Sequence, residues 1–159
     1  MTTTEQIVLK HRKTITLKPC IEVLNLSQIK ERFLVGYFDP LLEGGNLNEK
    51  QFPGESILID ISEMQPGQKA VVLQEIFNKE DMNMWIPQNR IVQTLKEYFQ
   101  ELIKNNLGNL FPVQTDNGVK YVLDIRINDQ NKLDFRLYDN WKDIKYDGEK
   151  KHRVFKHAA

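Results

Sequence analysis

The feature that most constrains the fold is an alternation of apolar and polar residues over positions 119–138. Every second residue from 119 to 127 is apolar, and the positions between them are mostly polar, with Val122 as the exception. The alternation resumes with Leu133, Phe135 and Leu137 after a polar break. A period of two is typical of β-strands that bury one face and leave the other in water. The segment therefore predicts a β-hairpin with one wet face.

Charges predict the register of this hairpin. The register that keeps the apolar faces together places Arg126 opposite Asp134 and Asp124 opposite Arg136. A shift by two residues would place Arg126 opposite Arg136. Opposite charges across a strand pair contribute about 0.2–1 kcal/mol, and like charges cost a similar amount. We therefore expect the first register, with residues 129–131 as the loop.

Apolar residues at helical spacing predict the main helix over residues 90–105. Ile91, Leu95, Tyr98 and Leu102 follow one another at intervals of three or four positions, so they form an apolar stripe. This stripe is expected to lie on the sheet. The residues expected in the shared core are Leu95, Phe99, Leu102, Ile125 and Phe135.

The remaining elements complete a fold-class prediction. Short strands separated by turns such as Asn117-Gly118 are typical of hairpins. Residues 39–55 are rich in Gly and Pro and show no period, which predicts a long loop that is either a functional segment or a plain surface excursion. We expect a single α+β domain over residues 1–159. Its antiparallel sheet, made of hairpins and a C-terminal meander, would pack against one long amphipathic helix.

Composition limits the partners that the chain can attract. The chain has 159 residues, with 22 basic and 22 acidic side chains. A chain without net charge has no overall field that would steer it to nucleic acid or to an anionic membrane. No stretch reaches the roughly 18 apolar residues of a membrane-spanning helix. The single cysteine, Cys20, suits a reducing compartment, so we expect a cytoplasmic protein of bacterial type.

Patterns for catalysis, metals and cofactors are weak. Three His and one Cys show no zinc-ligand spacing, and nucleophile-elbow and phosphate-loop motifs are absent. We expect no metal and no cofactor. One enzymatic interpretation stays open, in which His11, His152 and His157 act with Arg12 and Arg153 as base and acid of a metal-independent nuclease or another phosphodiester-cleaving enzyme. It requires the first and last strands to be neighbours, and few aromatic residues accompany these bases for stacking on nucleic acid.

The preferred interpretation is a non-enzymatic protein-binding domain. Acidic residues outnumber basic ones over residues 19–141, and aromatic residues lie among them. Aromatic side chains that anchor and acids that steer suit recognition of a basic protein, as in a small inhibitor or immunity-type protein. The expected contact residues are Trp85, Asp81, Glu80 and Tyr138. Trp85 is interpreted as an exposed anchor, with a core position as the alternative. The third interpretation is an accessory subunit that forms homo-oligomers through an exposed sheet edge.

Overall fold

The computed structural model describes residues 9–19, 26–43, 55–65, 71–72, 76–77, 85–114, 120–138, 145–146 and 150–158. The elements within them are, in chain order, β1 (Leu9–Leu17), η1 (Leu26–Glu31), β2 (Val35–Phe38), α1 (Pro40–Glu43), β3 (Ile57–Met64), β4 (Val71–Val72), α3 (Gln88–Glu97), η3 (Phe99–Glu101), β5 (Gly108–Gln114), β6 (Lys120–Ile127), β7 (Leu133–Tyr138), β8 (Lys145–Tyr146) and β9 (Arg153–Ala158). Of the loop expected over residues 39–55, residues 44–54 lie outside the described residues, and its start forms the short helix α1.

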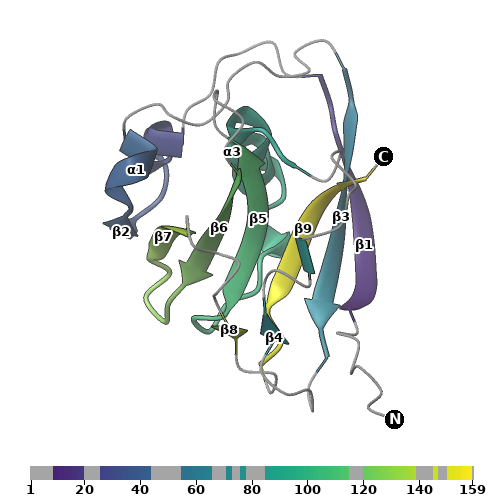
Figure 1. Ribbon diagram of the computed structural model, residues 1–159. Coiled ribbons are helices and arrows are strands. Elements are labelled where there is room, and N and C mark those ends of the chain that lie inside the picture. The colour runs from purple at the N-terminus through teal and green to yellow at the C-terminus, as the bar shows by residue number, and fades with distance from the viewer. Residues whose placement is uncertain are drawn as a thin grey trace.

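Seven strands form one sheet in the order β1-β3-β9-β5-β6-β7-β2, while β4 and β8 pair separately (Figure 1). The pairs β5–β9 and β2–β7 are parallel, and the other neighbours are antiparallel. The prediction of a purely antiparallel sheet is therefore wrong: the fold is a single α+β domain with a mixed sheet. Turn motifs signal only strands that follow one another, whereas both parallel pairs join segments that are far apart in the chain.

The β6–β7 hairpin has the expected register. Arg126 lies opposite Asp134, and Asp124 lies opposite Arg136. Asn131 has a φ of 59°, a conformation that asparagine tolerates better than most residues. On its own strand, the Nε of Arg126 donates a hydrogen bond of 3.0 Å to a carboxylate oxygen of Asp124. The alternation and the charges therefore predicted the register correctly. The hydrogen bond between Arg126 and Asp124 within β6 was not predicted.

The main helix is shorter than the predicted range of 90–105. It spans Gln88–Glu97 and ends at Tyr98, after which the chain forms the 3-10 turn η3. This turn lets Phe99 stack on Phe33, with ring centroids 5.0 Å apart, and still buries Leu102. The apolar residues over 98–102 that predicted a longer helix are thus brought to the core by a tighter 3-10 turn. No helix in the described ranges is long and apolar enough to span a membrane.

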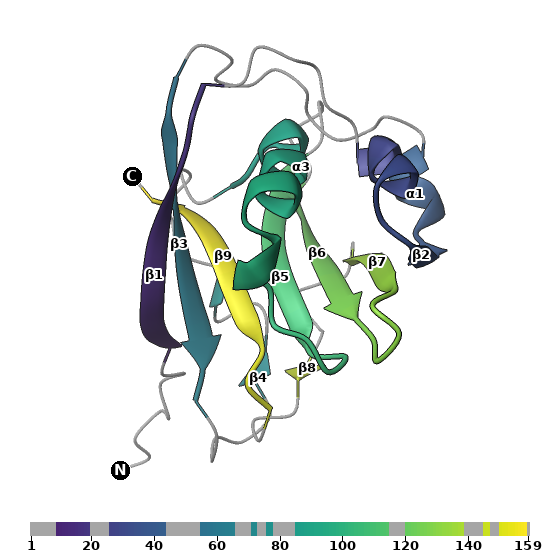
Figure 2. The same cartoon turned by 180° about the vertical axis from the view of Figure 1, so that it is seen from behind.

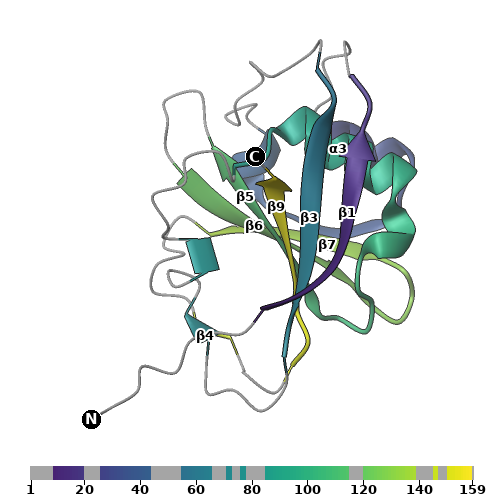
Figure 3. The same ribbon diagram turned by 90° about the vertical axis from the view of Figure 1, so that its right-hand side faces the viewer.

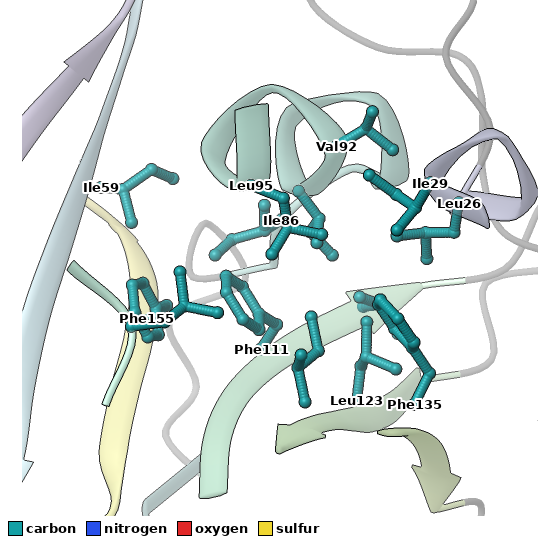
Figure 4. Close-up of a cluster of buried hydrophobic side chains, with 14 of the residues drawn as sticks. Leu26, Ile29, Ile59, Ile86, Val92, Leu95, Phe111, Leu123, Phe135 and Phe155 are labelled. Carbon is teal, nitrogen blue, oxygen red and sulfur yellow. The ribbon is translucent and has the colours of Figure 1, made fainter. Parts of the chain in front are cut away.

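Helix α3 covers one face of the sheet (Figures 2 and 3). Between them lies the main core, in which Leu95, Leu123 and Phe135 are fully buried (Figure 4). Of the residues expected to share this core, four belong to it, and Phe99 packs against it while remaining partly exposed. The placement of the helix on the sheet is therefore confirmed.

A second cluster of buried side chains covers the opposite face of the sheet. Its members are Met64, Ile76, Phe77, Trp85, Leu110, Val122 and Val154. The prediction that this face of the β6–β7 hairpin is wet is consequently wrong for its central part. The apolar Val122, which interrupts the polar positions of the alternation, was the signal in the sequence. Both faces of the sheet are buried at its centre.

Candidate functional site

The three histidines of the enzymatic interpretation do not converge. Strand β3 separates β1, which carries His11, from β9, which carries His157. His11 pairs with Ser62, which in turn pairs with Val154, so His11 lies on the face of Val154. His157 is three positions further along β9 and lies on the other face, because side chains alternate along a strand. The first and last strands are not neighbours, and the base–acid pair has no shared site.

His11 takes part in an exposed network on the paired strands β1 and β3. Its Nε2 lies 3.0 Å from Thr14 Oγ1 and 3.6 Å from an Asp60 carboxylate oxygen. The Thr14 hydroxyl donates a hydrogen bond of 2.5 Å to a carboxylate oxygen of Asp60. A nucleophilic hydroxyl would instead donate to the histidine that activates it. This geometry is that of a hydrogen-bonded surface network rather than a catalytic triad.

His152 belongs to a buried polar group with Asp124 and Arg126. Its side chain is 2% exposed, and its Nδ1 accepts a 2.7 Å hydrogen bond from the backbone N–H of Gly108. Asp124 is fully buried and binds Arg126. A Cβ added at Gly108 would lie 2.9 Å from the Asp124 carboxylate and 3.0 Å from His152 Nδ1. Both polar side chains therefore converge on the space that the glycine leaves, without access for a substrate.

Substitution of Gly108 by alanine is expected to lower the free energy of unfolding by about 1–3 kcal/mol, the usual cost of adding a group to a filled interior. The new methyl group would push against two buried polar side chains and lengthen the hydrogen bond to His152. Urea unfolding measures the loss. The exposed strand position Thr16 supplies the control, Thr16→Ala, and an equal loss in both variants would show that the space at Gly108 is not restricted.

Two of the expected partner-binding residues lie in one cluster. Trp85 is only 8% exposed and belongs to the second cluster, against which Tyr138 packs while partly exposed. The ammonium group of Lys120 lies 5.1 Å from the Trp85 ring centroid. Glu80 and Asp81 lie outside the described residues. The geometry thus brings Trp85 and Tyr138 together, but it buries the tryptophan instead of exposing it as an anchor.

Exposed apolar side chains lie on and directly before the outer strand β2. The sequence analysis did not predict this surface. Leu34 is 58% exposed and Tyr37 is 45% exposed. Of the described residues, Leu58 on β3 is the one other large apolar side chain with such exposure, at 42%. In the sequence, the signal for this surface was the uncharged run over residues 33–38, FLVGYF. Apolar residues gathered at the surface of a single domain are typical of interaction sites.

The two outer strands of the sheet differ in composition. β1 carries Lys10, Arg12 and Lys13 on exposed positions, and lysines on an outer strand discourage pairing with other chains. β2 has no charged residue and pairs with β7 in parallel, with an irregular register at Gly36. The β2 edge is therefore the less protected end of the sheet. We use "β2 edge" below for Leu34 together with residues 35–38.

Basic side chains surround the β2 edge. Lys30 Nζ lies 4.4 Å from the centroid of the Phe38 ring, and the Arg136 guanidinium lies 5.8 Å from that of Tyr37. Lys132 lies close to Gly36 of β2, because a Cβ added at Gly36 would be 3.9 Å from the Cβ of Lys132. Cations over aromatic rings contribute about 0.5–1 kcal/mol at exposed sites. Lys30 and Arg136 are thus each positioned by an aromatic ring of β2.

Comparisons with known proteins do not assign a family. No protein-family model, no curated protein and no solved structure matches the chain. Over the described ranges, no group of three or more His, Cys, Asp or Glu side chains is placed to hold a metal ion. The function is therefore inferred from the geometry of the surface and of the buried polar groups.

Proposed function

We propose that this protein is a binding domain that recognises another protein along the β2 edge. The observation that carries the proposal is the exposure of Tyr37, on an outer strand without charged residues, and of Leu34 directly before that strand. Apolar patches that a soluble protein leaves in water are typical of protein–protein interaction sites. Tyrosine is also enriched among the residues that dominate binding energy. The proposed role is therefore recognition instead of catalysis.

The nuclease interpretation has less support. It needs two imidazoles within reach of one phosphodiester, but His11 is exposed on β1 and His152 is buried with its Nδ1 occupied. The basic partner is expected from the excess of acidic residues over residues 19–141 and stays a prediction; of its expected contact residues, Glu80 and Asp81 are outside the described residues. An inhibitor or immunity-type role and a cytoplasmic location likewise stay predictions.

The double substitution Leu34→Ser/Tyr37→Ser is expected to weaken partner binding by about 2 kcal/mol or more, the range of interface hot spots. Both side chains are exposed, so stability is expected to change by less than about 0.5 kcal/mol. The partner is first captured with the wild-type chain, identified by mass spectrometry, purified, and then titrated calorimetrically against wild type and variant.

Leu58→Ser is the matched control, because it also removes a large exposed apolar side chain but from β3. It is expected to leave binding unchanged. If the double variant binds every captured partner as tightly as the wild type does, the β2 edge is not the recognition site and the proposal fails.

A further inference from the structure

We infer that the β2 edge binds an extended, acidic segment of its partner, which joins the sheet as a further strand beside β2. The inference rests on the proposed function, because it specifies what the same edge recognises. Strand addition supplies backbone hydrogen bonds, and side chains at alternate positions supply selectivity. The backbone of β2 and the charges around it carry the two halves of the argument.

Within the described ranges, β2 pairs with a neighbouring strand on one side, that of β7. Towards β7, the Leu34 carbonyl accepts from Leu133, and the N–H of Asp39 donates to the Phe135 carbonyl at 3.0 Å. The N–H of Tyr37 also points this way, since it donates to an Asp134 carboxylate oxygen at 2.9 Å.

Consecutive residues of a strand direct their N–H and C=O groups to opposite sides, apart from the irregularity at Gly36. Val35 and Phe38 therefore direct theirs away from β7. This outer row of donors and acceptors is what an added strand would pair with.

Charge selects the chemistry of the added strand. Lys30 and Arg136 lie over aromatic rings of β2, and Lys132 is next to Gly36. The carboxylates of the neighbouring Asp134 and Asp39 already accept backbone hydrogen bonds within the domain, from Tyr37 and Leu137. Opposite charges flanking an apolar strip steer association and set its specificity. An acidic strand with apolar or aromatic residues between its acids matches this surface.

The same charges disfavour a second copy of the chain at this edge. Pairing β2 with its own symmetry mate would bring Lys30, Lys132 and Arg136 of both copies together, and like charges facing each other across an interface are unfavourable. At the other outer strand, Arg12 and Lys13 already form ion pairs with Glu63 and Glu101. The outer strand whose own residues carry no charge, β2, is therefore also the one that an acidic strand fits.

The test uses short synthetic peptides in which glutamate alternates with valine and tyrosine. Fluorescence anisotropy compares this peptide with a version that carries lysine in place of every glutamate. The acidic peptide is expected to bind at least tenfold more tightly, and its affinity should fall as salt screens the charges. Two further versions carry N-methyl groups on one or the other set of alternate amides. One of the two sets should abolish binding, because only one set faces β2.

Protein variants locate the site. Lys30→Gln/Arg136→Gln is expected to weaken binding of the acidic peptide at least tenfold. The matched control is Lys10→Gln/Lys18→Gln, which removes two exposed charges near β1 and should bind as the wild type does.

Three results would overturn the inference. These are equal affinity for the lysine peptide, no binding of the acidic peptide, or indifference to both sets of N-methyl groups. A dimer seen by analytical ultracentrifugation that Tyr37→Ser dissociates would also overturn it, in favour of a second copy. None of these results alters the titration of the purified partner against Leu34→Ser/Tyr37→Ser, so failure of the inference is distinct from failure of the proposed function.

Discussion

Replacing Trp85 with alanine is expected to lower the free energy of unfolding by about 3–5 kcal/mol, as truncations of buried Trp and Phe do. The ring is 8% exposed and packs in the second cluster with Met64, Leu110 and Val122. An exposed anchor would behave in the opposite way, with intact folding and weakened binding. Urea unfolding followed by circular dichroism measures the loss without using the tryptophan signal.

Tyr37→Ala is the matched comparison, because it truncates an aromatic residue that is 45% exposed. Surface substitutions of this kind usually change stability by less than about 0.5 kcal/mol. If Trp85→Ala unfolds at the same urea concentration as Tyr37→Ala, the second cluster does not contribute to stability as its burial implies. Trp85 would then return as a candidate anchor.

Replacing Arg90 with methionine is expected to lower the free energy of unfolding by about 3 kcal/mol, because each hydrogen bond from a charged group contributes about 1.5–3 kcal/mol. Arg90 is fully buried near the start of α3. Its guanidinium donates to the carbonyls of Lys18 at 2.7 Å and Glu55 at 2.5 Å. Lys18 follows β1 and Glu55 precedes β3, so one side chain ties the helix to the ends of two paired strands.

Lys96→Met is the control for this substitution, since Lys96 lies on the same helix and is partly exposed. Its loss is expected to be small. Arg90→Lys should rescue stability only in part, because a lysine ammonium cannot reproduce the planar fork that bonds two carbonyls. If Arg90→Met and Lys96→Met unfold at the same urea concentration, Arg90 does not stabilise the fold by bonding the ends of β1 and β3.

Local patterns predicted the local parts of this fold. Alternation and charge placed Arg126 opposite Asp134, and helical spacing placed Leu95 over the sheet. The parallel pairing of β2 with β7 could not be read in this way, because Tyr37 and Asp134 are 97 residues apart and no turn motif joins them. The shorter helix has a related cause, since the stacking of Phe99 on Phe33 is a tertiary contact.

The candidate surface was predictable only in part. The uncharged run over residues 33–38 is visible in the sequence, but a buried strand would look the same. What distinguishes them is the position of β2 at the end of the sheet, which follows from pairings elsewhere. Trp85 shows the converse case: its irregular sequence context did not require burial, and the opposite face of the sheet buried it.

A ribosome making this chain releases strand β9 after every other strand of the sheet. β9 (Arg153–Ala158) lies between β3 and β5, so it joins the antiparallel pair β1–β3 to the β5–β6–β7 meander. Until its residues leave the exit tunnel, two half-sheets each present an open edge to other growing chains. The sheet is thus completed only after β9 has left the exit tunnel, so the time during which growing chains are exposed to aggregation depends on how quickly this strand is synthesised and released.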